Sequence, residues 1–207
     1  MIKAVIFDMD GVLIEAREWH YQALNKALRL FGLEISLYDH LMTFDGLPTK
    51  EKLKILSLDK GLPVALHSFV AEMKQQYTME IVHSLCKPKF HHEYALSKLK
   101  NDGYKMAVCS NSIRHTIEVM MQKAALESYF EFYISNEDVS KSKPDPQMYQ
   151  LAINKLNLTP KECLIVEDNE NGIKAAKASG AYIMEVQSVY EVNYENITKH
   201  IVKFTQG

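Results

Sequence analysis

The sequence predicts an α/β protein with a parallel sheet of about five strands and a small all-helical cap domain inserted after the first strand. Two observations predict this fold class. Short apolar runs alternate with helical patterns, which is typical of a parallel sheet covered by helices on both faces. The first two runs are separated by far more than the roughly thirty residues that one βαβ unit needs. We therefore expect an insertion between them.

Five apolar runs have the length and composition of buried strands. They are Ala4–Phe7, Met106–Cys109, Phe132–Ser135, Leu164–Val166 and Ile183–Val186. The last four follow one another at the spacing of βαβ units. We therefore expect residues 1–14 and 88–207 to form a Rossmann-like core.

The inserted segment, residues 15–87, has a helical pattern throughout. Apolar side chains recur at helical spacing at Trp19, Ala23, Ala27 and Leu30, and Gly32 suits the end of that helix. Residues 50–58 and 64–85 continue the helical pattern. Lys87-Pro88 marks the return to the core, because the residue before a proline disfavours helix.

Two further helix starts are predicted in the core. Thr159-Pro160-Lys161-Glu162 has the threonine, proline and glutamate of a capping box, and Asp145-Pro146 precedes another helical pattern. We expect His91-His92 to lie at the surface, since a helical metal-binding pair needs a spacing of four residues.

The composition limits the possible classes of function. The 207 residues carry a formal net charge of −2, so a general nucleic-acid-binding surface is not expected. No apolar stretch has the length of a membrane span, and no secretory leader is recognisable. Three widely spaced cysteines match no disulfide framework or zinc motif, which indicates reduced thiols in a cytoplasmic protein. The oligomeric state is left open between a monomer and a small homo-oligomer.

Asp8 and Asp10 directly follow the first predicted strand. Alternation along a strand points both side chains the same way. Ionised carboxylates at the edge of a core cost free energy unless something compensates them. A divalent metal ion, or a reaction that needs a nucleophile and an acid, would account for the pair.

Three other polar clusters follow later strands. They begin at Ser110, at Lys143-Pro144 and at Glu167-Asp168. In an open parallel sheet the carboxyl ends of the strands form the edge where ligands bind. The clusters are therefore expected to lie near Asp8 and Asp10.

These motifs, in this order, resemble those of the haloacid dehalogenase-like superfamily. The resemblance covers essentially the whole chain and is closest to the branch with a helical cap after the first strand, which contains β-phosphoglucomutases and phosphoglycolate phosphatases. It implies a Mg²⁺-dependent phosphatase that hydrolyses a small phosphorylated metabolite through an aspartyl-phosphate intermediate. An aspartate at position 10 favours an oxygen leaving group over halide, because an alkoxide needs a proton.

The resemblance also implies roles for individual residues. Asp8 would be the nucleophile, and Asp10 would be the general acid and base. Lys143 would pair with Asp8, and the Ser110 hydroxyl would donate a hydrogen bond to a phosphate oxygen. Mg²⁺ would be held by oxygen ligands. The implied metal ligands are Asp8, the backbone carbonyl of Asp10, Asp168, and Glu167 either directly or through water.

Substrate contacts are expected from four residues. They are Asn111, His20, Thr49 and Lys50. Related sugar-phosphate mutases carry basic residues in the cap loop of residues 43–50, whereas this chain has Asp45 and Thr49 there. That difference favours a phosphatase over a hexose-phosphate mutase. A non-catalytic binding or regulatory protein of the same fold is the third possibility.

Overall fold

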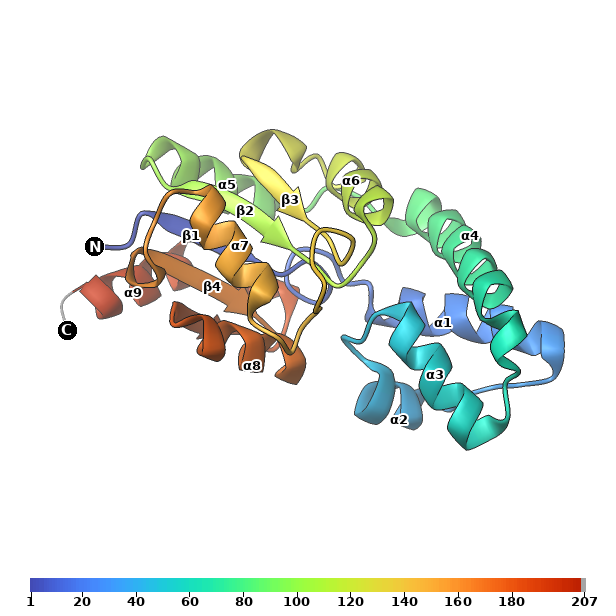
Figure 1. Ribbon diagram of the computed structural model, residues 1–207. Helices are drawn as coiled ribbons and strands as arrows, with labels where there is room; N and C mark the ends of the chain where they lie inside the picture. The colour runs from blue at the N-terminus through green and yellow to red at the C-terminus, as the bar shows by residue number, and fades with distance from the viewer. Residues whose placement is uncertain (206–207) are drawn as a thin grey trace. The chain divides into compact units, whose positions relative to one another are not determined.

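The computed structural model describes residues 1–205, and the chain divides into two compact units. The first, called the core unit, comprises Met1–Glu15 together with the chain from Lys87 onward. The second, called the cap unit, is Ala16–Cys86. Figure 1 labels the main helices and strands of both.

The core unit is built on one parallel sheet. Its strands are β1 (Ala4–Phe7), β2 (Lys105–Cys109), β3 (Phe132–Ile134), β4 (Cys163–Glu167) and β5 (Tyr182–Glu185). They lie in the order β3-β2-β1-β4-β5, and every neighbouring pair is parallel. All four residues of β1 are buried. Such uniform burial is expected for a central strand covered on both faces.

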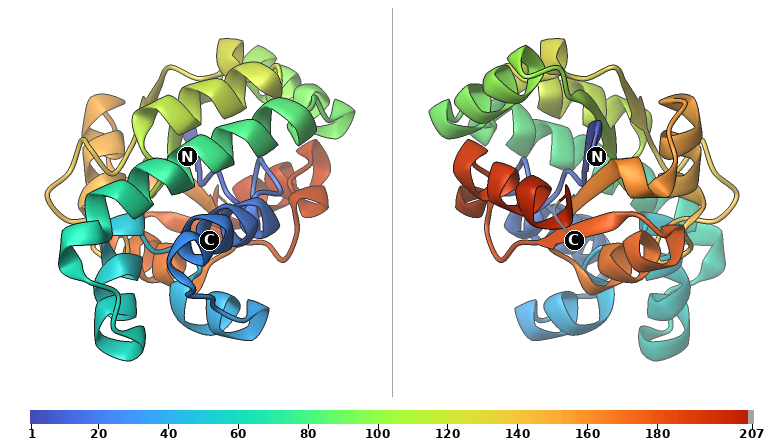
Figure 2. Two further views of the ribbon diagram at one scale, coloured as in Figure 1. Left: turned by 90° about the vertical axis from the view of Figure 1, so that its right-hand side faces the viewer. Right: turned by 90° about the vertical axis from the view of Figure 1, so that its left-hand side faces the viewer.

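Helices cover both faces of this sheet. The core helices are α5 (Phe90–Asn101), α6 (Arg114–Lys123), α7 (Gln147–Lys155), α8 (Glu170–Ser179) and α9 (Tyr194–Thr205). One face packs Ala4 and Ile6 against α7 and α8 in a continuous apolar cluster. Figure 2 shows α5 and α9 on the opposite side of the sheet, where they contact each other.

The end of β1 lies where the strand order of the sheet reverses direction. From β1 the chain proceeds outward through β2 to β3, and β4 and β5 then lie on the other side of β1. Ligands of open α/β sheets bind beyond the carboxyl ends of the strands at such a reversal. Asp8 is the first residue beyond β1 at this point.

The cap unit is entirely helical. Its helices are α1 (Arg17–Leu28), α2 (Leu37–Asp39), a π-helical turn (His40–Phe44), α3 (Thr49–Lys60) and α4 (His67–Leu85), with short 3₁₀ turns between some of them. Its small apolar core includes Leu24, Leu28 and Val70. Asn25 is buried there, and its amide exchanges two hydrogen bonds with the backbone of Ile35. The loop after α1 is therefore fixed without leaving a buried polar group unsatisfied.

The predicted fold class is confirmed: five parallel strands, with a helical insertion after the first. Each strand ends within one residue of its predicted limits. Gly32 ends the 3₁₀ turn Arg29–Phe31 that continues α1, in the left-handed conformation with φ of 71°. All three cysteines are free and buried, as expected. No helix among residues 1–205 is long and apolar enough to cross a membrane.

Two local predictions were wrong. The capping box at Thr159 forms, with Glu162 accepting from the Thr159 N–H at 2.8 Å, but it caps only the 3₁₀ turn Pro160–Glu162. The chain enters β4 directly afterwards, so tertiary pairing overrides the helix signal. His92 is buried rather than exposed, because its Nε2 donates to the carbonyl of Val189 at 2.9 Å inside the packed face of α5.

Candidate active site

A tight loop after β1 presents the first aspartates. The Asp8 N–H donates to the Val166 carbonyl at 3.0 Å, which extends the pairing of β1 with β4 by one residue. The Met9 carbonyl then accepts from the N–H groups of Leu13 and Ile14, both at 2.9 Å. Gly11 has φ of 89°, a conformation that glycine adopts without strain. The loop therefore turns sharply while Asp8 stays anchored to the sheet.

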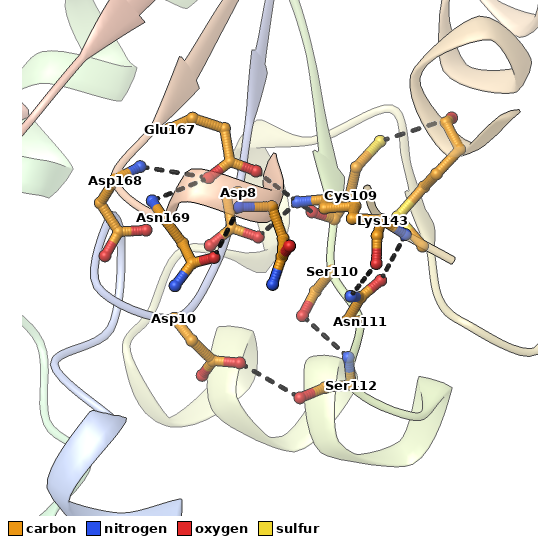
Figure 3. A network of polar contacts seen from close by, with 12 residues as sticks. Asp8, Asp10, Cys109, Ser110, Asn111, Ser112, Lys143, Glu167, Asp168 and Asn169 are labelled. Carbon is orange, nitrogen blue, oxygen red and sulfur yellow. Dashed lines mark hydrogen bonds and ion pairs between the residues drawn. The ribbon is translucent and has the colours of Figure 1, made fainter. Parts of the chain in front are cut away.

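Lys143 lies at the centre of the site. Its Nζ donates to Asp8 Oδ1 at 2.6 Å, to Glu167 Oε1 at 2.6 Å and to the Cys109 carbonyl at 2.9 Å. These three acceptors use all three ammonium protons. Figure 3 shows the lysine between the two carboxylates. Segments that lie far apart in the sequence thus converge at one edge of the sheet.

Glu167 is held by four donors. Its Oε1 accepts from Lys143 and from the Tyr149 hydroxyl, and its Oε2 from the backbone N–H groups of Asp168 and Asn169 at 3.1 and 3.4 Å. The helix α8 comes so close that a Cβ on Gly172 would lie 1.8 Å from Oε1. The carboxylate is therefore fixed on every side.

Burial and the neighbouring charges both shift the pKa values of Asp8 and Lys143. Burial raises the pKa of Asp8 well above its usual value, the ammonium of Lys143 opposes that rise, and the neighbouring carboxyl groups add to it. Burial by itself would lower the pKa of Lys143, but the charges of Asp8 and Glu167 outweigh it, so the pKa is raised. Lys143 is therefore cationic, and its positive charge favours the ionised form of Asp8.

The acidic residues fit a divalent cation. One carboxylate oxygen each from Asp8, Glu167 and Asp168 can be chosen so that all lie within 4.8 Å of one another. Oxygen donors are those that Mg²⁺ prefers. A bound cation would also offset the crowding of carboxylates that raises the pKa of Asp8. Both Glu167 oxygens already accept hydrogen bonds, which occupy lone pairs that a cation would need.

Ser110 and Ser112 lie beside the carboxylates, at the end of β2. The Ser110 hydroxyl is buried and accepts the Ser112 N–H at 3.1 Å, so its own proton can be donated. The Ser112 hydroxyl donates to Asp10 Oδ2 at 3.2 Å. Figure 3 shows both contacts. The Asp10 side chain is therefore oriented by a residue that the sequence had not singled out.

Asn111 is occupied with the backbone of Lys143. Its Oδ1 accepts the Lys143 N–H at 3.1 Å, and its Nδ2 donates to the Lys143 carbonyl at 3.2 Å. These paired bonds fix the loop that carries the lysine. The expected contact of Asn111 with substrate stays a prediction.

One of the cap residues expected to bind substrate, His20, is part of a basic cluster within the cap unit. His20 Nδ1 lies 3.2 Å from Lys74 Nζ. Lys52 and Lys74 are buried, and both lower the pKa of His40, to about 3, although burial of His40 itself is the largest cause. Thr49 is half-buried and Lys50 is exposed, at the start of α3. Lys52 is the buried lysine on α3. The expected substrate contacts of Thr49 and Lys50 stay predictions.

Several residues of these networks were not predicted from the sequence. They are Tyr149, Gly172, Ser112, Lys52 and Lys74. Tyr149 and Lys74 have the apolar or amphipathic spacing of ordinary helix residues, so no local signal distinguished them from their neighbours on the same helices. Gly172 belongs to the polar run after β4. The sequence alone does not show that α8 approaches the Glu167 carboxylate at this residue.

The fold and the site define a class: a Rossmann-like hydrolase with a cap and an aspartate–lysine–acidic cluster at its sheet edge. A family model described as haloacid dehalogenase-like hydrolase matches residues 5–186. The chain therefore belongs to the haloacid dehalogenase-like hydrolases. Within them it falls in the helical-cap group of β-phosphoglucomutase and phosphoglycolate phosphatase.

Individual relatives are similar over most of their length. A phosphorylated carbohydrates phosphatase of Thermotoga maritima is 28% identical over 181 residues, covering 86% of this chain and 82% of the relative. A phosphoglycolate phosphatase of Aquifex aeolicus is 27% identical over 179 residues, with the same coverages of 86% and 82%. Among solved structures, β-phosphoglucomutase from Clostridium difficile superposes with a TM-score of 0.87 at 21% identity, covering 100% of both chains. That last likeness concerns the fold.

Proposed function

We propose that this protein is a Mg²⁺-dependent phosphatase that hydrolyses a small phosphorylated metabolite, such as a sugar phosphate, through an aspartyl phosphate on Asp8. The observation that carries the proposal is the contact of Lys143 Nζ with Asp8 Oδ1 at 2.6 Å, just beyond the central strand. A cationic partner keeps a buried carboxylate ionised and oriented for attack. The phosphatase names of the two relatives support the same class of reaction.

The reaction divides into two transfers. An Asp8 oxygen forms a bond to phosphorus while the bond to the ester oxygen breaks, and Asp10 gives that leaving oxygen its proton. Asp10 then takes a proton from water, which attacks the same phosphorus and releases Asp8 and inorganic phosphate. Ser112, which donates to Asp10 Oδ2, holds that carboxyl group in place. Ser110 donates to an oxygen of the transferring group, and the nearby charge of the Lys143 ammonium stabilises the negative charge on that group.

Asp8, Asp168 and the backbone carbonyl of Asp10 would hold Mg²⁺. When bound, the ion neutralises charge on the phosphoryl oxygens and on the crowded carboxylates. Glu167 acts mainly through Lys143, because its own oxygens accept four hydrogen bonds.

The test is release of inorganic phosphate from a panel of phosphorylated metabolites, with Mg²⁺ present and absent. We expect turnover of at least one sugar phosphate, and loss of that turnover in Asp8→Asn while the chain stays folded. Retained activity in Asp8→Asn would exclude the nucleophile. Lack of phosphate release from the whole panel would favour a non-catalytic binding protein of this fold.

A hexose-phosphate mutase is the second candidate, and the basic cluster of the cap supports it. His20, Lys52 and Lys74 gather around His40, and such groups can bind a second phosphate. Against it, the cap loop carries Asp45, which pairs with Arg17 at 3.4 Å, where related mutases have basic residues. Conversion of one sugar monophosphate into another, activated by a bisphosphorylated sugar and without phosphate release, would select the mutase.

A further inference from the structure

Tyr149 is a buried polar residue that the proposed reaction does not use. It lies on α7, and no part of it is exposed. Its ring belongs to the apolar cluster between α7, α8 and the sheet. Its hydroxyl, however, donates to Glu167 Oε1. A core position that needed only volume would be filled by phenylalanine, which buries no polar atom.

The hydroxyl is the first member of a chain of contacts that ends at Asp8. Glu167 Oε1 accepts from both Tyr149 and Lys143, and Lys143 Nζ is shared equally, at 2.6 Å each, between Glu167 and Asp8. The same Nζ lies 4.7 Å from the centre of the Tyr149 ring. Tyr149 thus supports the lysine twice, directly through its ring and indirectly through its hydroxyl.

We propose that the Tyr149 hydroxyl is a positioning group, which holds the Glu167 carboxylate so that Lys143 stays against Asp8. This inference rests on the proposed function, in which Asp8 is the nucleophile. A neutral donor on a rigid helix fixes Oε1 without adding charge to the site. It also stabilises part of the negative charge of Glu167, so the ammonium is drawn less strongly away from Asp8.

The rest of the Glu167 environment cannot replace this contact. The backbone N–H groups of residues 168 and 169 bond only to Oε2. The backbone of Gly172 borders Oε1 but offers space, not a donor. Without the hydroxyl, Oε1 would depend on Lys143 alone. The carboxylate would rotate more freely, and the lysine would move with it.

The decisive variant is Tyr149→Phe, which keeps the ring and removes one hydroxyl. The matched control is Tyr194→Phe, because the Tyr194 hydroxyl also donates to a carboxylate, that of Asp102 at 2.7 Å, on the exposed surface. For both variants kcat, KM and the unfolding midpoint are measured. Hydrogen exchange of the Lys143 ammonium is followed by ¹⁵N NMR, which needs no substrate.

We expect Tyr149→Phe to lower kcat about tenfold, the effect of one hydrogen bond to a charged group, while KM stays within twofold. Exchange of the Lys143 ammonium protons should accelerate severalfold. Tyr194→Phe should change neither. A kcat within twofold of wild type, or one that falls only with the folded fraction, would overturn the proposal. If the wild type hydrolyses nothing, the proposed function fails, and unchanged ammonium exchange in Tyr149→Phe would independently refute the positioning role.

Discussion

The core unit and the cap unit bury charge in opposite ways. In the core, the ammonium of Lys143 is surrounded by two carboxylates and a carbonyl, and each charge supports the position of the next. In the cap, Lys52, Lys74 and His20 all lower the pKa of His40 and so add to the effect of its burial. The core therefore combines charges of opposite sign in one set of direct contacts, whereas the buried histidine of the cap is affected by neighbouring basic groups.

The largest effect is expected from breaking the core network at its centre. Lys143→Met leaves Asp8 and Glu167 facing each other without the cation that they share. We expect kcat to fall by about 10³-fold or more. We also expect a loss of about 3–5 kcal/mol in the free energy of unfolding, because unpaired buried charges remain. Steady-state kinetics and urea unfolding measure both.

Lys141→Met is the control for that variant, since the Lys141 side chain is 75% exposed two residues away. It should leave kcat within twofold. A Lys143→Met enzyme that keeps more than a tenth of wild-type turnover would show that the core charges are merely structural.

Replacement of one glycine in each unit gives a second comparison of the core with the cap. In the core, a Cβ at Gly172 would lie 1.8 Å from Glu167 Oε1, so Gly172→Ala must displace that carboxylate. We expect kcat to fall by tens of fold and stability by roughly 1–3 kcal/mol. In the cap, Gly61 has φ of 69° and no atom near its Cβ position. Gly61→Ala should therefore cost only about 1 kcal/mol and leave kcat unchanged. Equal kinetic effects of the two substitutions would contradict the comparison.

Acid should destabilise both units through one histidine each. Burial lowers the pKa of His92 in the core to about 4 and that of His40 in the cap to about 3. A folded-state pKa below the unfolded value of 6.5 means that the stabilisation is complete above pH 6.5 and is lost as the pH falls toward the folded pKa. Between pH 6.5 and 5, each histidine should cost about 2 kcal/mol.

Urea unfolding at pH 7 and pH 5 checks this effect. His92→Gln retains a donor for the Val189 carbonyl, and the difference between its two unfolding free energies should be about 2 kcal/mol smaller than in the wild type. An identical pH dependence would mean that His92 titrates normally in the folded core.

The sequence indicated the clustered polar residues that follow strands. It did not indicate the residues whose contacts depend on tertiary packing. Asp8, Lys143 and Glu167 each follow or end a strand-like segment, and a parallel sheet brings such ends together. Tyr149 has the spacing of any core residue on α7, so only the tertiary contact with Glu167 reveals its hydroxyl as special. Lys52, two residues after Lys50, is buried in the cap. Its burial depends on how α3 packs inside the cap, which local periodicity did not define.

The smallest effect is expected from the cap. Lys52→Met removes one of the charges that lower the pKa of His40, so that pKa should rise. If the cap binds an anionic part of the substrate, KM should increase about threefold, the modest effect of one charge in a site that retains others, while kcat stays within twofold. Lys54→Met is the control, since Lys54 is exposed on the same helix and pairs with Glu51. NMR titration of His40 and steady-state kinetics provide the two measurements. A fall in kcat as large as that of Lys143→Met, at constant KM, would place Lys52 in the chemical step and contradict a substrate-binding role for this lysine.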